Sequence, residues 1–476
     1  MITASHNPEC DNGFKIVDSS GGLLEESWEG LCTDLANGKD ENIEKDVEEL
    51  IKMFNIDWSL PAKVYVARDT RSSSKSLSEA LVTGIKTACG EAVDEGLLTT
   101  PQLHYIIRCI NSNGSYGEAS ENGYYNKLAK AYLELSSKYL NRKNYHPKLF
   151  LDGANGIGAL QMKKLAPLLS SALEFDIIHD ENGILNHECG ADFVKVNQRE
   201  PINIKLKSGN RYASFDGDAD RIIYFYLNSQ DNKFHMLDGD KIAVLVAKYL
   251  QDMLKKANIN DVSVSIIQTA YANGASTIYM RDVLKMETFC VPTGVKHLHH
   301  KAEQCEIGVY FEANGHGTIL FSSETEQKLK HLNNAAADEL LLFIDIVNQT
   351  VGDAISDMLV VEIILQSFDM NIEQWDSFYT DLPNRLMKQA VRDRNVVSTT
   401  DAERRCVTPV GMQHSIDNSV KKYGSRARSF VRPSGTEDVV RIYSEADNQN
   451  DADRLAKEVT NLVIEFADGI GEKYVL

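Results

Sequence analysis

Short apolar runs alternate with longer stretches of helical spacing along much of the chain. Residues 63–67 and 148–151 have the length and apolar content of buried strands. Each run is followed by a polar or glycine-rich turn and then by a helical stretch, near residues 75–89 and from residue 159 onward. This strand–loop–helix rhythm predicts α/β domains with largely parallel sheets, and ligands in such folds bind in the loops that follow strands.

Length and turn-like segments give the expected domain boundaries. The chain has 476 residues, which corresponds to roughly three domains at about 150 residues each. Helical spacing over residues 124–140 leads into a new strand, and residues 229–232 and 367–374 are polar and turn-like. The last section is expected to end in a helix over residues 451–466. The expected divisions are residues 1–145, 146–231, 232–372 and 373–476.

Charge and composition narrow the class of partner. The chain carries 50 Lys and Arg against 69 Asp and Glu, a net charge of −19, so its average surface would repel nucleic acid. An anionic small substrate therefore requires a local basic cluster. The sequence has neither an apolar run near the ~18 residues of a membrane-spanning helix nor a signal-peptide pattern. Its eight cysteines lack a CxxC pair, which favours reduced thiols. We expect a cytoplasmic protein with no nucleic-acid or membrane partner.

The first loop with candidate chemistry is Thr3-Ala4-Ser5-His6-Asn7-Pro8. A serine among small and polar residues can act as a nucleophile or carry a phosphate if a neighbour offsets its weak acidity. His6 and Lys15 are the candidates for that role. From spacing alone, an ordinary polar turn in which Ser5 caps a helix is the favoured interpretation.

The second loop holds three carboxylates, Asp216, Asp218 and Asp220, between two apolar stretches. In an extended loop these side chains point the same way and repel one another unless a counter-charge is present. A hard divalent cation with oxygen ligands, Mg²⁺ in particular, resolves the repulsion. An EF-hand is excluded because Arg221 and Leu227 occupy its required Gly and Glu positions. A metal site is favoured over a solvated acidic turn.

The third loop is Glu312-Ala313-Asn314-Gly315-His316, which follows an apolar run. Glu312, Asn314 and His316 offer donors and acceptors suited to sugar hydroxyls. The Asn-Gly pair is equally typical of a hairpin turn. Both interpretations stay open from the sequence.

The fourth loop supplies the basic cluster that the net charge requires. It is Arg432-Pro433-Ser434-Gly435-Thr436, and Arg441 adds a second positive charge if the chain folds back. An arginine can bind a phosphate in bidentate fashion, and the small residues offer hydroxyls and backbone N–H groups as an anion nest. Phosphate binding is favoured here over a surface turn.

Three further features have simpler interpretations. Residues 153–158 have the order GxxGxG and are interpreted as a strand-to-helix turn rather than a dinucleotide loop. His297, His299 and His300 lie beside lysines, which predicts a solvated helix face. Residues 68–71 are expected to give electrostatic support or to face a substrate.

Taken together, the four loops resemble those of the α-D-phosphohexomutase family. Further stretches with the same resemblance are residues 67–71, 96–105, 189–192, 293–299 and 312–316. The resemblance covers essentially the whole chain. It implies three related α/β/α domains plus a C-terminal α+β domain around a central cleft. The branch of the family with the greatest similarity implies interconversion of N-acetylglucosamine 6-phosphate and 1-phosphate, through a phosphoserine and a 1,6-bisphosphate, toward UDP-N-acetylglucosamine.

The resemblance also implies a role for each loop. Ser5 would carry the phosphate, and His6 and Lys15 would serve in proton transfer or charge stabilisation. One Mg²⁺ per chain would be bound by Asp216, Asp218, Asp220 and a phosphoserine oxygen. A small-molecule sugar phosphate is the expected partner, a sugar 1,6-bisphosphate the expected activator, and the chain is expected to be monomeric. The expected substrate-binding residues are Glu312, Ala313, Asn314, His316, Arg432, Pro433, Ser434, Gly435, Thr436 and Arg441.

The chain departs from the family pattern at its start. Family members carry several tens of residues before the phosphoserine loop, including a Gly-Thr-Ala-Gly-Phe-Arg segment, whereas this sequence begins within the strand that leads to Ser5. On that basis the N-terminal part of the first domain is expected to be missing and activity to be reduced or absent. A mutase for glucose, mannose or glucosamine phosphate, an inactive sugar-phosphate-binding form and a phosphatase stay open as alternatives.

Overall fold

The computed structural model describes residues 1–180, 183–435 and 437–475. The chain forms two compact units, each built from several segments. The first unit comprises Met1–Gly239, Asn314–Ile319 and Glu326–Ile372. The second comprises Asp240–Ala313, Leu320–Thr325 and the chain from Glu373 onward.

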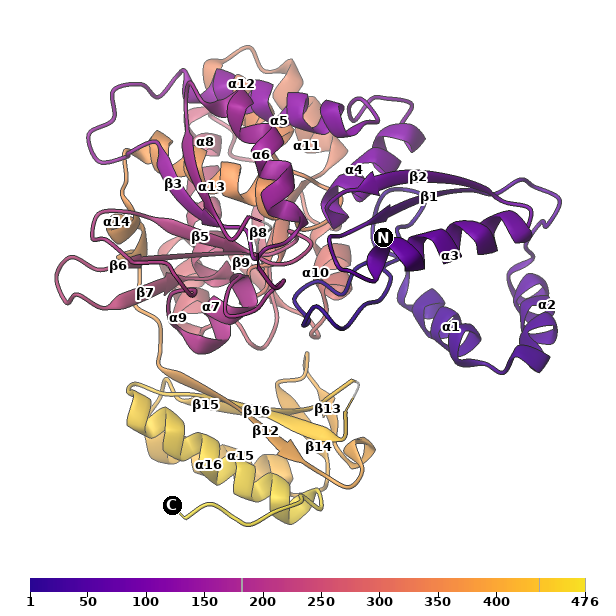
Figure 1. The fold of residues 1–476 in the computed structure, drawn as a ribbon. Helices are drawn as coiled ribbons and strands as arrows, with labels where there is room; N and C mark the ends of the chain where they lie inside the picture. The colour runs from indigo at the N-terminus through magenta and orange to yellow at the C-terminus, as the bar shows by residue number, and fades with distance from the viewer. Residues whose placement is uncertain (181–182, 436, 476) are drawn as a thin grey trace. The chain divides into compact units, whose positions relative to one another are not determined.

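The N-terminal part of the first unit contains a two-stranded parallel sheet. Strand β1 (Lys63–Arg68) pairs with β2 (Glu91–Leu97), and helix α3 (Ser74–Thr87) connects them and lies along one face (Figure 1). The strand and helix expected over residues 63–67 and 75–89 are confirmed. The other helices of this part are α1 (Glu26–Asn37), α2 (Ile43–Phe54), α4 (Thr100–Asn111) and α5 (Glu121–Ser136).

A five-stranded sheet of order β4-β3-β5-β6-β7 is the centre of the first unit. Its strands are β3 (Lys148–Asp152), β4 (Glu174–Ile178), β5 (Tyr212–Phe215), β6 (Ile222–Leu227) and β7 (Phe234–Leu237). Strands β3, β4 and β5 are parallel, β6 pairs antiparallel with β5, and β7 pairs antiparallel with β6, so the sheet is mixed. Helices α6 (Ile157–Leu169) and α7 (Ala191–Asn197) belong to the same part.

One expected domain boundary is corrected by this sheet. The division between residues 231 and 232 falls inside the hairpin that joins β6 to β7, and the two strands pair in one sheet. The polar residues there form a tight turn: the side chain of Asn228 accepts hydrogen bonds from the backbone N–H groups of Gln230 and Asp231. A hairpin turn and an interdomain linker have the same polar composition, so the sequence pattern could not distinguish this turn from a domain boundary.

A four-stranded sheet of order β11-β10-β8-β9 follows along the chain. Its strands are β8 (Val264–Gln268), β9 (Glu287–Cys290), β10 (Ile307–Phe311) and β11 (Gly317–Phe321). Strand β8 is parallel to both β9 and β10. The accompanying helices are α8 (Gly239–Lys256), α9 (Gly274–Ile278), the π-helical turn η2 (Tyr279–Val283) and α10 (Val295–Ala302).

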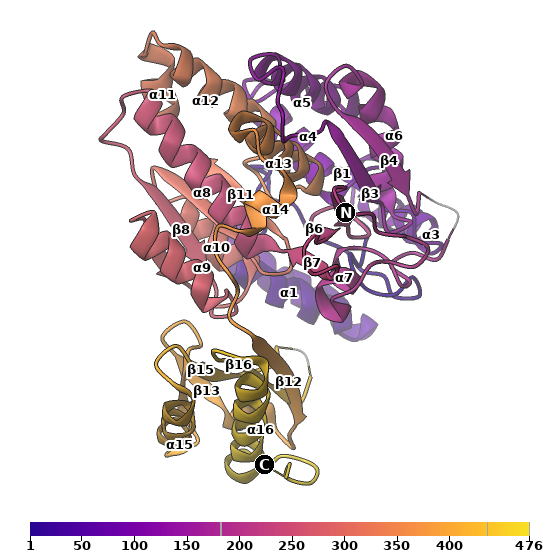
Figure 2. The same ribbon diagram turned by 90° about the vertical axis from the view of Figure 1, so that its left-hand side faces the viewer.

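Helices of the first unit that come later in the sequence pack against α5. They are α12 (Ala335–Ile346) and α13 (Ala354–Phe368), which lie beside α5 in both ribbon views (Figure 2). Helix α13 is apolar on nearly all sides and almost wholly buried, as its sequence AISDMLVVEIILQSF predicts. Two short helices, α11 (Ser323–His331) and α14 (Ile372–Asp376), flank this pair in the sequence.

The C-terminal part is α+β, as expected. Strands β12 (Asn384–Ala390), β16 (Val439–Glu445) and β15 (Arg428–Pro433) form an antiparallel sheet in that order. Helices α15 (Met412–Val420) and α16 (Gln449–Phe466) cover one face of it (Figure 2). Their apolar sides form a core with the sheet. A small hairpin, β13 (Ser398–Thr400) and β14 (Arg405–Thr408), completes this part.

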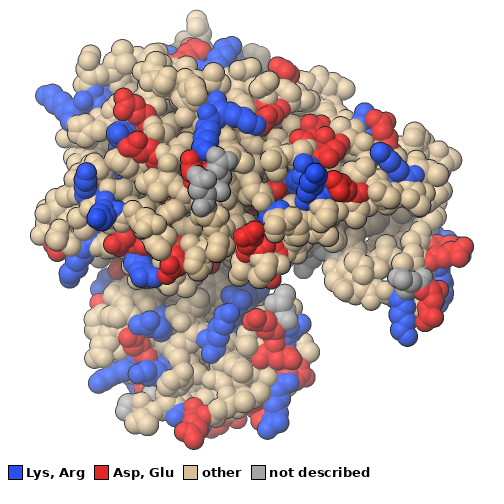
Figure 3. Space-filling model, in the orientation of Figure 1, with Lys and Arg blue, Asp and Glu red and all other residues tan. Residues whose placement is uncertain are grey.

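The surface in Figure 3 mixes the two signs of charge. Lys and Arg side chains lie next to Asp and Glu across the whole visible face. Among the described residues, no helix combines the length and the apolar composition of a membrane span.

Candidate functional site

Ser5 lies in a turn that follows a short extended segment. Ile2 forms isolated bridges with Arg68 at the end of β1 and with Phe14, which fixes the start of the loop. Ser5 is 7% exposed and has φ of 47°, in the left-handed region. Its Oγ donates a hydrogen bond to Asp218 Oδ2 at 3.3 Å. The helix-cap interpretation of Ser5 is wrong, because residues 1–25 form turns and bridges but no helix.

The aspartate loop joins β5 to β6. It is a tight turn and not the extended loop expected, because Ala219 has φ of 58° and Asp216 Oδ1 accepts the backbone N–H groups of Asp220 and Arg221 at 3.0 and 3.2 Å. The turn still makes the carboxylates converge: oxygen atoms of Asp216, Asp218 and Asp220 all lie within 4.8 Å of one another. All three side chains are buried.

Glycines let the serine loop, residues 3–13, and the aspartate loop, residues 216–221, approach each other. A Cβ atom on Gly217 would lie 2.4 Å from the carbonyl oxygen of Ser5. A Cβ atom on Gly156, in the turn between β3 and α6, would lie 2.6 Å from the carbonyl oxygen of Gly217. Both contacts are possible only without a side chain. The interpretation of residues 153–158 as a strand-to-helix turn is confirmed, and its glycine serves this close packing.

Replacing Gly217 with alanine is expected to lower the free energy of unfolding by about 1–3 kcal/mol, because a backbone atom must move to admit the methyl group. Denaturant unfolding measures the change. Gly84 in α3 is a matched control, since a Cβ there meets nothing within 4 Å and alanine favours a helix. Equal stability of wild type and Gly217→Ala would contradict the close approach.

Lys15 bridges two of the three aspartates. Its Nζ donates to Asp218 Oδ2 and to Asp220 Oδ2, both at 2.7 Å. Burial acts to lower the pKa of Lys15, but the two carboxylates outweigh it and raise the pKa above its usual value. Lys15 therefore stays protonated, which favours charge stabilisation over proton abstraction for this residue.

The remaining carboxylate oxygens suit a hard divalent cation. Among the residues that the structure describes, Asp216 Oδ2, Asp218 Oδ1 and Asp220 Oδ1 are buried and have no hydrogen-bond partner. Burial and the neighbouring carboxylates raise the pKa of Asp216 well above its usual value. For Asp220, burial acts to raise the pKa, but the charges of Lys15 and His316 outweigh it and hold the pKa well below its usual range. Each carboxylate thus has one oxygen without a hydrogen bond to any described residue. Three such oxygens fit Mg²⁺, which prefers oxygen ligands and retains several waters.

The surroundings of His6 favour its neutral form. Burial lowers the pKa of His6, and the guanidinium of Arg221 lowers it further. Its Nδ1 is buried and has no hydrogen-bond partner within the described part of the chain. A neutral imidazole can accept a proton on its unprotonated ring nitrogen.

Three residues around Ser5 were not identified as site residues from the sequence. Arg71 and Asn186 hydrogen-bond to backbone carbonyls of the serine loop. Thr100 donates its hydroxyl to Asp218 Oδ2 at 2.6 Å and its backbone N–H to the carbonyl of the same residue at 3.3 Å. Residues 68–71 were expected to give electrostatic support or to face a substrate, and the structure shows Arg71 hydrogen-bonded to the serine loop instead. The signal for Thr100 is the helix start Thr-Thr-Pro-Gln, where the N-cap Thr99 forms a capping box and leaves Thr100 in the first turn.

The third loop is the hairpin turn between β10 and β11. Asn314 Oδ1 accepts the His316 backbone N–H at 2.9 Å, and Gly315 has φ of 89°. Asn314, Gly315 and His316 belong to the first unit and reach the aspartate loop: the Gly315 carbonyl accepts the Ile222 N–H at 3.2 Å. His316 Nδ1 lies 3.5 Å from Asp220 Oδ1. Glu312 and Ala313 belong to the second unit.

The fourth loop lies in the second unit, between β15 and β16. Arg432 and Arg441 are direct partners across these antiparallel strands, so their side chains share one face. The chain thus folds back and brings a second positive charge beside Arg432, as expected. The Ser434 N–H donates to the Val439 carbonyl at 2.9 Å across the mouth of the loop. Thr436 lies outside the described residues.

Arg432 has an acidic partner that the sequence did not indicate. Its Nε donates to Glu403 Oε1 at 2.7 Å. Glu403 lies in the β13–β14 hairpin with φ of 66°, and its Oε2 accepts the Thr293 backbone N–H at 3.0 Å and the Thr293 hydroxyl. The guanidinium is therefore held by its Nε edge.

Two other polar clusters have structural roles. Oxygen atoms of Asp152 accept from the Ala154 and Gly190 backbone N–H groups, from the Ser214 hydroxyl and from His179 Nδ1, so this carboxylate is fully used although His179 and Cys189 lie near it. The solvated face expected for His297, His299 and His300 is wrong for His299. That side chain is buried, and its ring pairs with the hydroxyl of Tyr310 at 3.0 Å.

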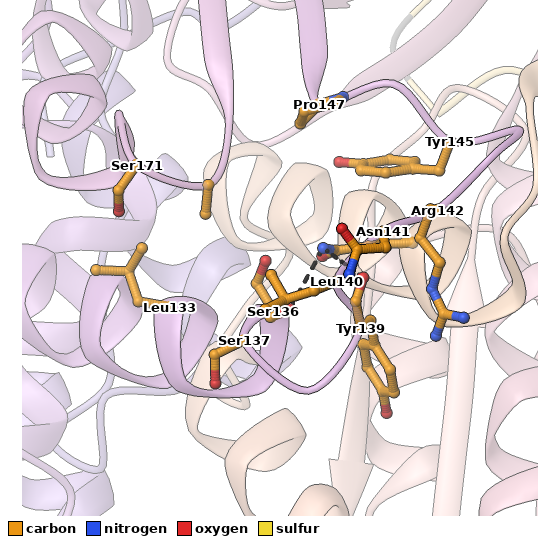
Figure 4. Close-up of a pocket in the computed structure, with 12 residues that line it drawn as sticks. Leu133, Ser136, Ser137, Tyr139, Leu140, Asn141, Arg142, Tyr145, Pro147 and Ser171 are labelled. Atoms are coloured by element: carbon orange, nitrogen blue, oxygen red, sulfur yellow. Dashed lines mark hydrogen bonds between the residues drawn. The ribbon is translucent and has the colours of Figure 1, made fainter.

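A cavity of about 400 Å³ lies elsewhere in the first unit (Figure 4). The end of α5, the loop before β3 and the loop after α6 line it. Gln366 of α13 also lines it and donates to the carbonyls of Ser136 and Tyr139 at 3.4 and 3.2 Å. Its lining includes none of the residues expected in the functional site.

Models of protein families match four successive parts of this sequence. The model described as phosphoacetylglucosamine mutase AMG1, domain II, matches residues 115–223, and that of domain III matches residues 238–370. The phosphoglucomutase/phosphomannomutase C-terminal domain matches residues 385–462. The alpha/beta/alpha domain I of the same group matches residues 1–42 and 36–134.

Individual relatives agree with the family matches. Phosphoacetylglucosamine mutase of Mus musculus is 49% identical over 99% of this chain and 88% of the mouse protein. That of Candida albicans is 46% identical over 97% of this chain and 89% of its own length.

Solved structures of N-acetylglucosamine-phosphate mutases have the same fold as this chain. An N-acetylglucosamine-phosphate mutase of the alpha-D-phosphohexomutase superfamily, in its substrate complex, has a TM-score of 0.92 at 46% identity, over 97% of this chain and 88% of that one. Aspergillus fumigatus N-acetylphosphoglucosamine mutase, in complex with GlcNAc-6P and magnesium, has a TM-score of 0.92 at 43% identity, over 98% and 88% of the two chains. With a buried serine facing three aspartates and these matches along almost its whole length, the chain belongs to the phosphoacetylglucosamine mutase family of the α-D-phosphohexomutase superfamily.

Proposed function

We propose that this chain is an isomerase that interconverts N-acetylglucosamine 6-phosphate and N-acetylglucosamine 1-phosphate through a phosphoserine at Ser5. The observation that carries the proposal is the juxtaposition of Ser5 with the aspartate cluster: the Ser5 hydroxyl lies 3.3 Å from Asp218, and oxygens of three buried carboxylates converge beside it. A cation held there would lie next to a phosphate on Ser5.

The reaction consists of two phosphoryl transfers in opposite directions. Phosphorylated Ser5 gives its phosphoryl group to the free hydroxyl of the sugar phosphate: the bond from phosphorus to the serine oxygen breaks, and a bond to the sugar oxygen forms. The resulting 1,6-bisphosphate reorients, and its other phosphoryl group returns to Ser5. The phosphate count is conserved, so one product leaves and the phosphoenzyme is restored.

The residues around Ser5 are proposed to accept the proton, to stabilise the charge of the transferred group and to bind the metal ion. The sugar hydroxyl loses a proton as it attacks, and His6, whose pKa is lowered chiefly by burial, is the proposed acceptor. Lys15 is the proposed source of permanent positive charge for the transferred group. Mg²⁺, held by Asp216, Asp218, Asp220 and a phosphoserine oxygen, would neutralise charge during transfer.

The other two loops are proposed to bind the substrate. Glu312, Ala313, Asn314 and His316 would contact the sugar, and His316 would also order Asp220. The phosphate that is not transferred would be bound by Arg432, Pro433, Ser434, Gly435, Thr436 and Arg441. Since the substrate must bind in two orientations, a phosphate clamp separate from the serine suits the reaction.

Solved relatives with magnesium and with glucose 1,6-bisphosphate support these two ligands for the superfamily. For this chain we propose one Mg²⁺ per chain, and a sugar 1,6-bisphosphate that phosphorylates Ser5 and thus activates the enzyme. A monomer in the cytoplasm is the proposed state. All eight cysteines carry free thiols in the described structure, which suits that compartment.

The test is the conversion of N-acetylglucosamine 6-phosphate by the full chain, followed by ³¹P NMR with Mg²⁺ and a catalytic amount of sugar 1,6-bisphosphate. The expected result is the 1-phosphate signal. Glucose, mannose and glucosamine 6-phosphates are the competing substrates, and faster turnover of any of them would overturn the substrate assignment. Inorganic phosphate as the main product would indicate a phosphatase.

Replacing Glu403 with glutamine is expected to raise KM for the sugar phosphate about tenfold, with kcat within about twofold. Glu403 holds Nε of Arg432 and so leaves the two Nη groups to face a phosphate, and the amide weakens that charged hydrogen bond. Steady-state kinetics measures both constants. Glu465→Gln, which removes an exposed partner of Lys473, is the control. A lower KM would mean that Glu403 competes with the phosphate instead of orienting Arg432.

A further inference from the structure

The serine loop needs support from outside itself. Ser5 has φ of 47°, a backbone conformation that non-glycine residues adopt rarely. The loop, residues 3–13, has few backbone hydrogen bonds of its own: the Thr3 N–H donates to the Gly13 carbonyl, the Asn7 N–H to the Ala4 carbonyl, and the Asp11 N–H to the Pro8 carbonyl. Surrounding residues must therefore hold the turn that aims Ser5 Oγ at Asp218.

Arg71 provides support from the end of β1. Its guanidinium is fully buried and donates to four backbone carbonyls of the loop. Nη2 donates to Ser5 at 2.9 Å and to Asn7 at 3.0 Å, while Nη1 donates to Pro8 at 2.5 Å and to Asp11 at 3.0 Å. Only a guanidinium offers donors in a planar fork that can reach four acceptors at once.

Asn186 donates hydrogen bonds to two of the four carbonyls that Arg71 binds. It lies in the segment between β4 and α7, and its Nδ2 donates to the Ser5 carbonyl at 2.8 Å and to the Asn7 carbonyl at 3.0 Å. Its own φ of 57° and the contact between its backbone N–H and the Ala154 carbonyl fix its position. The Ser5 carbonyl is thus bound by Arg71 and Asn186 together, with Gly217 packed against it.

The charge of Arg71 is offset locally. Its Nε donates to Asp69 Oδ2 at 3.0 Å, and the Arg71 and Asp69 side chains are both fully buried. The same carboxylate oxygen accepts the Thr3 hydroxyl at 2.7 Å, which ties the pair to the beginning of the loop. A neutralised guanidinium contributes little net field at Ser5, so its contribution is geometric.

We propose that Arg71 and Asn186 are positioning residues that clamp the Ser5–Asn7 backbone and fix the direction of Ser5 Oγ. The proposal rests on the proposed phosphoserine function of Ser5 and adds two residues to it. Both act on carbonyl groups and leave Ser5 Oγ to the aspartate cluster. Their loss would therefore misplace the reacting oxygen and lower kcat, while the affinity for the sugar phosphate stays the same.

The experiment compares wild type with Arg71→Lys, Asn186→Ala and the double variant. Arg392→Lys is the control, because Arg392 forms an exposed pair with Asp468. Steady-state kinetics on N-acetylglucosamine 6-phosphate gives kcat and KM. Hydrogen–deuterium exchange of the peptide over residues 1–14, followed by mass spectrometry, reports loop opening without any need for turnover.

The expected loss in kcat is about 100-fold for Arg71→Lys and about tenfold for Asn186→Ala, with KM within about threefold of wild type. The exchange rate of the peptide over residues 1–14 should rise at least about tenfold, while peptides of α16 exchange as in wild type. The double variant should lose less than the product of the single effects, because both side chains bind the Ser5 and Asn7 carbonyls.

Other results would overturn the clamp. Wild-type kcat in Arg71→Lys would mean that only the charge matters, and a raised KM with unchanged kcat would indicate a substrate-binding role. Unchanged exchange in the peptide over residues 1–14 of the variants would exclude clamping. If the wild type itself showed no turnover, faster exchange in the variants would still support the clamp, and only the proposed function would be refuted. If Arg71→Lys does not fold, Asn186→Ala gives the same decision.

Discussion

Ser5→Ala is expected to lose mutase activity by about four orders of magnitude or more, because Ser5 is the proposed carrier of the phosphoryl group between the two halves of the reaction. The fold should be retained: the Ser5 side chain forms one hydrogen bond, at 3.3 Å, while the turn is held through the backbone carbonyl. Turnover is measured by ³¹P NMR, and circular dichroism checks the fold.

Ser59→Ala is the matched control for Ser5→Ala. Ser59 is exposed, and its hydroxyl bonds to Asp57 far from the aspartate cluster in the sequence. The control should keep wild-type activity. If Ser5→Ala kept more than about a hundredth of the wild-type rate, Ser5 would not be the phosphate carrier.

Asp218→Asn is expected to remove both Mg²⁺ binding and mutase activity. Asp218 is the most connected of the three aspartates: its Oδ2 accepts from Ser5, Lys15 and Thr100, while its buried Oδ1 has no hydrogen-bond partner among the described residues. An amide of the same shape offers one oxygen and no charge. We expect Mg²⁺ affinity to fall at least about 100-fold and kcat by about three orders of magnitude.

Calorimetric titration with Mg²⁺ measures this affinity directly. Asp231→Asn is the control, because Asp231 is an exposed carboxylate beside His235 in the β6–β7 hairpin. Wild-type affinity in Asp218→Asn would show that the cation binds elsewhere. Loss of activity with normal affinity would limit Asp218 to the orientation of Ser5 and Lys15.

Residues with distinctive local chemistry could be predicted from the sequence. Three carboxylates at alternate positions between apolar strands are costly without a cation, and the structure gathers them between β5 and β6. Arg432 and Arg441 could be expected to meet because a glycine-containing turn separates two apolar stretches. The local sequence pattern was sufficient to predict site residues where the interacting groups lie within one loop.

Residues that act over long sequence distances could not be predicted in the same way. Arg71 and Asn186 lie 66 and 181 positions from Ser5, and only the fold brings their donors to its carbonyl. Glu403 meets Arg432 through a separate hairpin. The expected boundary near residue 231 and the expected solvation of His299 were wrong for a related reason: polar residues in a tight turn or on a covered helix have the same composition as solvated ones.

The most direct test of a phosphorylated Ser5 beside an aspartate-bound cation is ³¹P NMR of the full chain after reaction with a sugar 1,6-bisphosphate, with Mn²⁺ titrated in place of Mg²⁺. A phosphoserine signal should appear, mass spectrometry should assign it to Ser5, and about one Mn²⁺ per chain should broaden it. A phosphate on another residue, or a Ser5 signal that Mn²⁺ leaves sharp, would contradict the proposed site.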